Sequence, residues 1–279
     1  MKKAFIYFLF VIFIVPVFSL EIPSDGVMDS VLGKTMYDEI ERGITYSDSE
    51  SVRASGHGFL LMKFQKRFGF PSAMGNSIII AHDNGLLSVY GNLEENSVIE
   101  FDNIQSGSTI ARTGSSAFGN PGDLLFQVID TIQKAKLNPL LLLPEIQDKS
   151  RPALDSLMLT SSQGTDYTVY QNRRIRPGEY KIYVSSYDTI GRPGVRMPVY
   201  KTTFFVNGEE KCEMRSETLK EKDGILYYSA DSDIKIKPDS GKGTEIGSVL
   251  LRPGKNTVSI ELVDLAKNSS TFNWVIWVE

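Results

Sequence analysis

Residues suited to nucleophilic, acid–base or metal chemistry are few in this chain. Its 279 residues include two histidines, His57 and His82, and one cysteine, Cys212. The sequence contains no His-x-His, His-Glu-x-x-His or Cys-x-x-Cys motif, the spacings in which many catalytic zinc and thiol sites occur. His57 lies in Ser-Gly-His-Gly and His82 in His-Asp-Asn-Gly. We therefore interpret both histidines as turn or surface residues.

The other candidate groups also have simple structural interpretations. Glu94, Glu95 and Asp102 are interpreted as solvated surface acids. The Gly-rich stretch 114–122 lacks the lysine and the helix of a phosphate-binding P-loop. Cys212 has no second cysteine to pair with and is interpreted as a buried small hydrophobe. No self-contained catalytic motif emerges from the sequence.

The first half of the chain is dominated by short β-rich runs separated by glycine-containing turns. Two of these runs, 77–81 and 86–90, flank an Asn-Gly turn, which is a strong signal for a β-hairpin. Further strands are expected over 59–64, 106–111 and 124–129. These runs predict a β domain over residues 46–144.

One helix is expected before this domain. Val31, Leu32, Met36 and Ile40 fall near a helical stripe, and Gly43 could end the helix. We therefore predict a lead-in segment over residues 20–45 that contains a short helix over 29–42.

The second half shows the strict alternation of half-buried strands. Examples are 180–184, 258–262 and 272–278. Two stretches share a pattern: Arg-Pro-Gly at 176–178 precedes Asp188 by the same interval as Arg-Pro-Gly at 252–254 precedes Asp264. We interpret each as a turn that starts a strand and an Asp-led turn that ends it.

This second pattern predicts a β-sandwich over residues 153–279. The polar stretch 145–152, which contains Pro152, is predicted to be a linker between two separable halves.

The N-terminus predicts export. Lys2 and Lys3 precede the apolar run Ala4–Val17, and Ser19 follows it, as in a cleaved signal peptide over residues 1–19. The run is shorter than the ~18 apolar residues of a spanning helix, although an uncleaved anchor remains the alternative. We expect a periplasmic or cell-envelope location, with no stable membrane span after cleavage.

The charge balance argues against a nucleic-acid partner. Without residues 1–19, 28 basic and 34 acidic residues remain, which leaves no basic excess for binding phosphates.

Residues 77–93, Ser-Ile-Ile-Ile-Ala-His-Asp-Asn-Gly-Leu-Leu-Ser-Val-Tyr-Gly-Asn-Leu, carry a family resemblance. They resemble the central hairpin of lysostaphin-type (LytM-like) peptidoglycan endopeptidases. The strand 106–111, the Gly-rich loop, the segment 123–127 and Asn138-Pro139 follow in that family's order, so the resemblance covers about residues 40–144. It implies a mostly β fold with a LytM-like antiparallel β domain. Residues 258–268 are similar to bacterial immunoglobulin-like domains, which implies an immunoglobulin-like sandwich.

The departures from the family concern its zinc site. The family's His-x-His pair corresponds to Asp123 and Leu125, and the histidine of its Tyr-x-His-Leu motif to Asn92. Its earlier His-x-x-x-Asp ligand pair corresponds to Glu41 and Thr45. Leucine cannot bind a metal and asparagine cannot act as a general base. The resemblance therefore implies a degenerate site with no metal, no other cofactor and no catalytic residues.

The leading hypothesis is a non-catalytic envelope protein. Its peptidase-like domain would bind a cell-wall hydrolase, a peptidoglycan peptide or another envelope partner, as a regulator or scaffold. The predicted binding groove consists of Asn92, Ser115, Ser116, Phe118, Asn120 and Asp123. Two alternatives remain open: an active zinc endopeptidase with substitute ligands such as Glu41 and Asp123, and a purely structural or adhesive β protein.

Overall fold

A computed structural model describes residues 19–36, 39–65, 72–95, 97–98, 102–117, 119–229, 233–236 and 241–279. Within these residues the chain forms twenty-four strands and one short 3-10 helix, Pro139–Leu141, so the mostly β prediction is confirmed. The predicted signal peptide lies outside the described residues, apart from Ser19. No helix in the described part has the length and apolarity needed to span a membrane.

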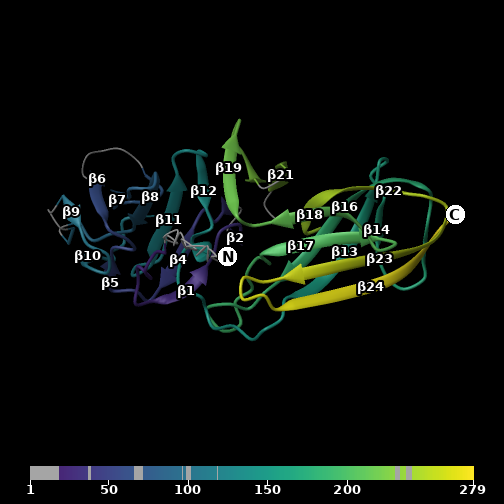
Figure 1. Cartoon of the computed structure of the whole chain (residues 1–279), viewed down its shortest axis with the longest axis horizontal. Helices are drawn as coiled ribbons and strands as arrows, with labels where there is room; N and C mark the ends of the chain where they lie inside the picture. The colour runs from purple at the N-terminus through teal and green to yellow at the C-terminus, as the bar shows by residue number, and fades with distance from the viewer. Residues whose placement is uncertain are drawn as a thin grey trace, which may run out of the picture.

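A large antiparallel sheet forms the first half of the molecule (Figure 1). Its strands from this half are β1 (Val27–Ser30), β4 (Ile44–Ser47), β6 (Gly58–Phe64), β7 (Ser77–Ala81), β8 (Leu86–Gly91), β9 (Asn103–Ile104), β11 (Leu124–Asp130) and β12 (Ala135–Leu137). The order runs β12-β11-β8-β7-β6-β9, and β4 pairs with both β1 and β11. A separate two-stranded sheet consists of β5 (Ser51–Arg53) and β10 (Thr109–Arg112).

The predicted hairpin at the centre of this sheet is present. Ile78 pairs with Tyr90 and Ile80 with Ser88, so β7 and β8 are antiparallel neighbours. Gly85 in the connecting turn has φ +77°, a conformation that glycine adopts without steric cost. Tyr90 is fully buried, and its hydroxyl accepts a hydrogen bond from the Ser55 backbone N–H at 2.7 Å.

The predicted helix over 29–42 is wrong. The described residues of this stretch form the end of β1 and a small hairpin of β2 (Thr35–Met36) and β3 (Glu39–Ile40). Gly33 turns the chain with φ +88°, and a side chain there would collide with the hydroxyl of Tyr228. Val31 is buried in the core of the first half and Leu32 in the core of the second. The apolar spacing that suggested one helical face therefore reflects packing into two different cores.

Two sheets of the second half pack over a common apolar core. One contains β13 (Ala153–Ser161), β14 (Asp166–Thr168), β16 (Gly178–Tyr187) and β22 (Thr244–Leu251). The other contains β15 (Arg173–Ile175), β17 (Lys201–Val206), β18 (Glu209–Arg215), β23 (Gly254–Val263) and β24 (Ser269–Val278). The alternating residues Ile182, Phe204 and Ile260 are buried in the shared core, as a β-sandwich requires.

Residues 218–229 and 233–236 differ from the sequence prediction, which placed them in the sandwich. They form β19 (Thr218–Lys222), β20 (Ile225–Ser229) and β21 (Asp233–Ile236). These strands extend the large sheet of the first half, because β19 pairs with β12 (Figure 1). Residues 145–152 contain no strand, as expected of a connection.

The two halves are joined by more than this connection. Asn138 is buried; its backbone N–H donates to Glu217 O at 2.7 Å and its Nδ2 to Ser216 O at 2.8 Å. Ile190 and Met197 of the second half lie in the apolar core of the first. The predicted separability of the halves therefore conflicts with their shared sheet and shared cores.

Candidate binding site

The residues that the sequence analysis singled out in the first domain converge at one end of the large sheet. Leu125 on β11 pairs with Thr45 on β4 and with Gly91 on β8. Asp123 immediately precedes β11, and Asn92 immediately follows β8. Residues separated by up to 80 positions thus lie together because β11 has β4 on one side and β8 on the other.

Glu41 and Thr45 form a local hydrogen-bonded unit at this end of β4. Glu41 Oε2 accepts a hydrogen bond from the Thr45 hydroxyl at 2.7 Å. Its Oε1 accepts from the backbone N–H groups of Arg42 at 2.9 Å and Gly43 at 3.2 Å. The Glu41 carboxylate therefore organises the turn into β4.

Asn92 is completely buried and fastens the Gly-rich loop to the sheet. Its Nδ2 donates to the backbone oxygens of Asn120 at 3.1 Å and Asp123 at 2.8 Å. Its Oδ1 accepts from the backbone N–H of Ala117 at 2.9 Å. Asn92 has φ +63°, and asparagine is one of the few non-glycine residues that adopt this region readily. The side-chain amide of Asn92 thus hydrogen-bonds to the backbone of the loop, and asparagine suits the positive φ at this position.

The loop is closed at its base by two further contacts. The Gly122 backbone N–H donates to Gly114 O at 3.0 Å, which brings the two ends of the loop together. Buried Asp123 accepts a hydrogen bond from the Asn120 backbone N–H at its Oδ2, 3.0 Å away. Burial raises the pKa of Asp123, although the hydrogen bonds from Asn120 oppose this effect.

The predicted groove residues divide into a buried set and an exposed set. Asn92 and Asp123 lie beneath the loop, whereas Ser115 and Asn120 are exposed on it. The Ser116 hydroxyl is used internally: it donates to Leu93 O at 3.1 Å and accepts from the Asn76 backbone N–H at 2.9 Å. Phe118 lies outside the described residues. The loop is therefore anchored from below by side chains and offers an exposed polar rim.

The two histidines lie away from this site. His82 occupies the β7–β8 turn, as predicted, but it is buried. Its Nδ1 lies 2.7 Å from His57 O, and its Nε2 lies 2.9 Å from Ser88 Oγ. Since a carbonyl can only accept, Nδ1 carries the proton. Burial lowers the pKa of His82, and the nearby His57 carbonyl and Asp83 oppose that shift.

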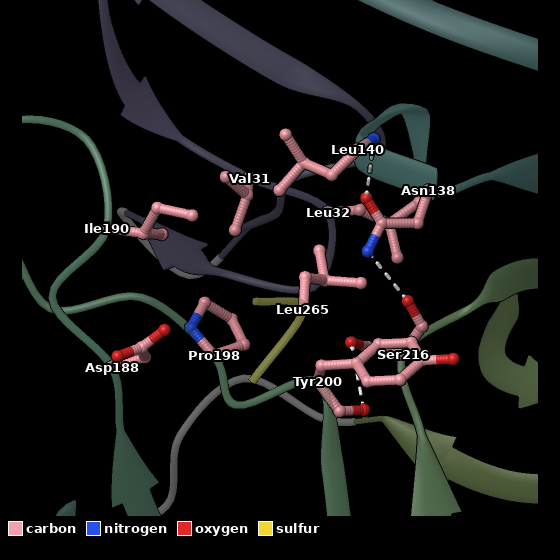
Figure 2. Close-up of a pocket in the computed structure, with 10 residues that line it drawn as sticks. All are labelled: Val31, Leu32, Asn138, Leu140, Asp188, Ile190, Pro198, Tyr200, Ser216 and Leu265. Carbon is pink, nitrogen blue, oxygen red and sulfur yellow. Dashed lines mark hydrogen bonds between the residues drawn. The ribbon is translucent and has the colours of Figure 1, made fainter. Parts of the chain in front are cut away.

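A second group of residues surrounds a small cavity between the halves. The sequence did not indicate a site here. The cavity has a volume of about 20 Å³, enough for about one water molecule. Figure 2 shows Val31 and Leu140 from the first half facing Pro198 and Leu265 from the second, with Asp188 at one side. The dashed line from Asn138 to Ser216 in Figure 2 is the contact that joins the two halves here.

Asp188 is one of three carboxylates near this cavity. Burial, together with the charges of Asp148 and Asp264, raises the pKa of Asp188 to about 6. In the sequence, Asp188 and Asp264 stand out because each follows an Arg-Pro-Gly turn by the same interval. That repeated interval did not indicate that the two carboxylates would lie close together in the fold.

Comparison with known proteins identifies the first domain. Residues 40–139 match the model of peptidase family M23. A second family model, which has no descriptive name, matches residues 151–279. An uncharacterized protein of Treponema pallidum (strain Nichols) is 34% identical over 101 residues, which cover 31% of this chain and 69% of that protein. The first domain of this chain is therefore similar to peptidase family M23 over residues 40–139.

Similar solved structures include a chain of the SpoIIQ–SpoIIIAH pore-forming complex, with 18% identity and a TM-score of 0.37 over 46% of this chain and 92% of that one. Lysostaphin from Staphylococcus simulans is 12% identical, with a TM-score of 0.34 over 89% of this chain and 95% of that one. At these values the likeness carries no functional information.

Proposed function

We propose that this chain is a non-catalytic envelope protein whose M23 domain binds a partner through the rim of the Gly114–Gly122 loop. The partner would be a peptidoglycan peptide, a cell-wall hydrolase or another envelope protein. The observation that carries the proposal is Leu125, which lies between Thr45 and Gly91 where the family resemblance implies a zinc ligand.

The donor set at this position does not fit catalytic zinc. Such a site needs three nitrogen, sulfur or oxygen ligands from the protein and an open position for water. Leu125 has no ligating atom, and both oxygens of Glu41 already accept hydrogen bonds from the turn. The Asn92 amide also forms hydrogen bonds with the backbone of the loop, and an amide cannot act as a general base.

The loop has the properties of a preorganised binding surface. Loops fixed on a rigid sheet commonly carry binding residues, and prior ordering reduces the entropy lost on binding. Here the hydrogen bonds of Asn92, Ser116 and Asp123 hold the loop from below. Ser115 and Asn120 remain exposed to a partner.

The test combines binding, metal content and hydrolysis. The chain without residues 1–19 is sedimented with insoluble peptidoglycan and, separately, used to capture cross-linked proteins from envelope extract. We expect binding in one assay, no stoichiometric zinc and no released peptidoglycan fragments. Ser115→Arg should weaken that binding about tenfold, the effect of ~1.4 kcal/mol at an interface.

The matched control is Ser269→Arg, the same substitution at an exposed position on β24. It should leave binding unchanged. Binding that is unaffected by Ser115→Arg would disprove the role of the loop. One equivalent of tightly held zinc, with chelator-sensitive cleavage of peptidoglycan, would instead establish a working peptidase with substitute ligands.

A further inference from the structure

Three aspartates from distant parts of the sequence meet at the junction of the two halves. Asp148 lies in the connecting segment, Asp188 follows β16, and Asp264 follows β23. One carboxylate oxygen from each lies within 4.8 Å of those of the others. Asp188 is 4% exposed and Asp264 is 3% exposed, while Asp148 is partly buried. The fold thus concentrates three acidic groups in a largely enclosed place.

The hydrogen bonds around the cluster orient the carboxylates without neutralising them. Asp264 accepts from the backbone N–H of Asn268 at 2.7 Å and from its Nδ2 at 2.8 Å. The same Nδ2 donates to the backbone oxygen of Asp148 at 3.2 Å, which ties the connecting segment to the turn after β23. Within the described part of the chain, Asp188 accepts only from the adjacent backbone N–H of Thr189, at 2.8 Å.

One carboxylate oxygen of the three aspartates is buried without a hydrogen-bond partner among the described residues. Asp148 Oδ1 accepts from the Ser150 backbone N–H at 2.8 Å, but Asp148 Oδ2 is buried and accepts no hydrogen bond from any described residue. Among the described residues, none of the three carboxylates forms a salt bridge. A buried carboxylate oxygen is costly without a donor or a cation, and adjacent carboxylates repel one another.

We propose that Asp148, Asp188 and Asp264 bind one calcium ion. Calcium takes six to eight oxygen ligands with flexible geometry, and carboxylates, backbone carbonyls and water supply them in proteins. The cluster offers only oxygen, with no histidine or cysteine for a softer metal. The three ligands also lie on turns and a connecting segment rather than in one rigid element, which suits calcium better than the strict octahedron of magnesium.

A bound ion here would fasten the connecting segment to the sandwich. It would neutralise the repulsion between three carboxylates and hold the connecting segment 145–152 against the ends of two sandwich strands. The repeated interval from Arg-Pro-Gly to Asp places an aspartate directly after β16 and another directly after β23. Because the ends of these two strands lie close together, both aspartates can bind the same ion.

The test uses the full chain without residues 1–19, freed of metal by a chelator and dialysed. At about 10 mM CaCl2, roughly 100 times a Kd of about 0.1 mM, the midpoint of thermal unfolding should rise by about 5 °C or more. Calcium should also slow trypsin cleavage after Lys149, which is exposed in the connecting segment.

Asp188→Asn is the decisive variant because it retains the oxygen that accepts from Thr189 and removes the charge. Without calcium it should be at least as stable as the parent, since it relieves repulsion. Its calcium affinity should fall at least tenfold, with the trypsin protection lost. Asp102→Asn, at an exposed acid outside the cluster, is the control and should respond to calcium like the parent.

Three outcomes would overturn the proposal. They are an absence of any calcium effect on the parent protein, an equal calcium effect on Asp188→Asn, and an equal effect of magnesium at the same concentration. If Asp188→Asn elutes as aggregate in size-exclusion chromatography, Asp148→Asn takes its place, because Asp148 lies in the connecting segment rather than in the sandwich core.

Discussion

Replacement of Asn92 tests whether this residue holds the Gly-rich loop. Asn92→Ala removes three hydrogen bonds of a buried side chain, to Ala117, Asn120 and Asp123. At about 1 kcal/mol each they contribute ~3 kcal/mol. Alanine at φ +63° adds roughly 1 kcal/mol of backbone strain. The free energy of unfolding should therefore fall by ~4 kcal/mol, a large share of the ~5–15 kcal/mol typical of domains.

Asn92→Gly separates the two contributions. Glycine loses the same three hydrogen bonds but adopts the positive φ without strain, so it should cost ~3 kcal/mol. Urea unfolding monitored by tryptophan fluorescence gives both values. Hydrogen exchange should show faster exchange at the Ala117 amide in both variants, because its acceptor Asn92 Oδ1 is gone.

The reasoning fails if Asn92→Ala lowers the free energy of unfolding by less than about 1 kcal/mol, the value of a single hydrogen bond. It also fails if Asn92→Gly is no more stable than Asn92→Ala, since the strain at this position would then be absent. Unchanged exchange at the Ala117 amide would show that the loop is held by other contacts.

The buried imidazole of His82 and the joined halves give two further predictions. Because burial lowers the pKa of His82, below about pH 6.5 the unfolded chain binds a proton that the folded chain does not. Stability should fall with decreasing pH by up to about 1.4 kcal/mol per unit, and His82→Gln should lose this part of the dependence between pH 7.5 and 5.5. Since β12 pairs with β19, the full chain should unfold in one calorimetric transition, and fragment 20–152 should aggregate through the uncovered edge of β12. Two transitions and a soluble fragment would restore the view that the halves are independent.

Much of the fold was predictable where the determinants are local. The hairpin of β7 and β8 follows from two β-rich runs around an Asn-Gly turn, and the sandwich strands follow from alternation. The pairing of β12 with β19 was not predictable, because it joins short strands about 80 residues apart whose sequences carry no distinctive pattern. The helix prediction over 29–42 failed for a related reason: periodicity identifies apolar spacing but not which core each side chain enters.

The proximity of the candidate residues was predictable from the sequence, but their hydrogen bonds were not. The resemblance placed Glu41, Thr45, Asn92, Asp123 and Leu125 in one place, and their elements do meet at one end of the sheet. The sequence could not show that Asn92 clamps the loop, because its partners are backbone atoms, which every residue type possesses.

The shared sheet also determines how the binding surface must be tested. Deleting residues 153–279 would remove β19 together with the sandwich and would expose β12, which is the neighbour of β11. Since the start of β11 supports the Gly-rich loop, a loss of binding in such a deletion would report damage to the sheet as readily as a lost contact. Substitution at the exposed position Ser115 avoids this ambiguity, because its side chain can change without disturbing the strands beneath it. Single-residue substitutions therefore distinguish binding by the loop from binding by the sandwich, whereas deletion of one half of the chain does not.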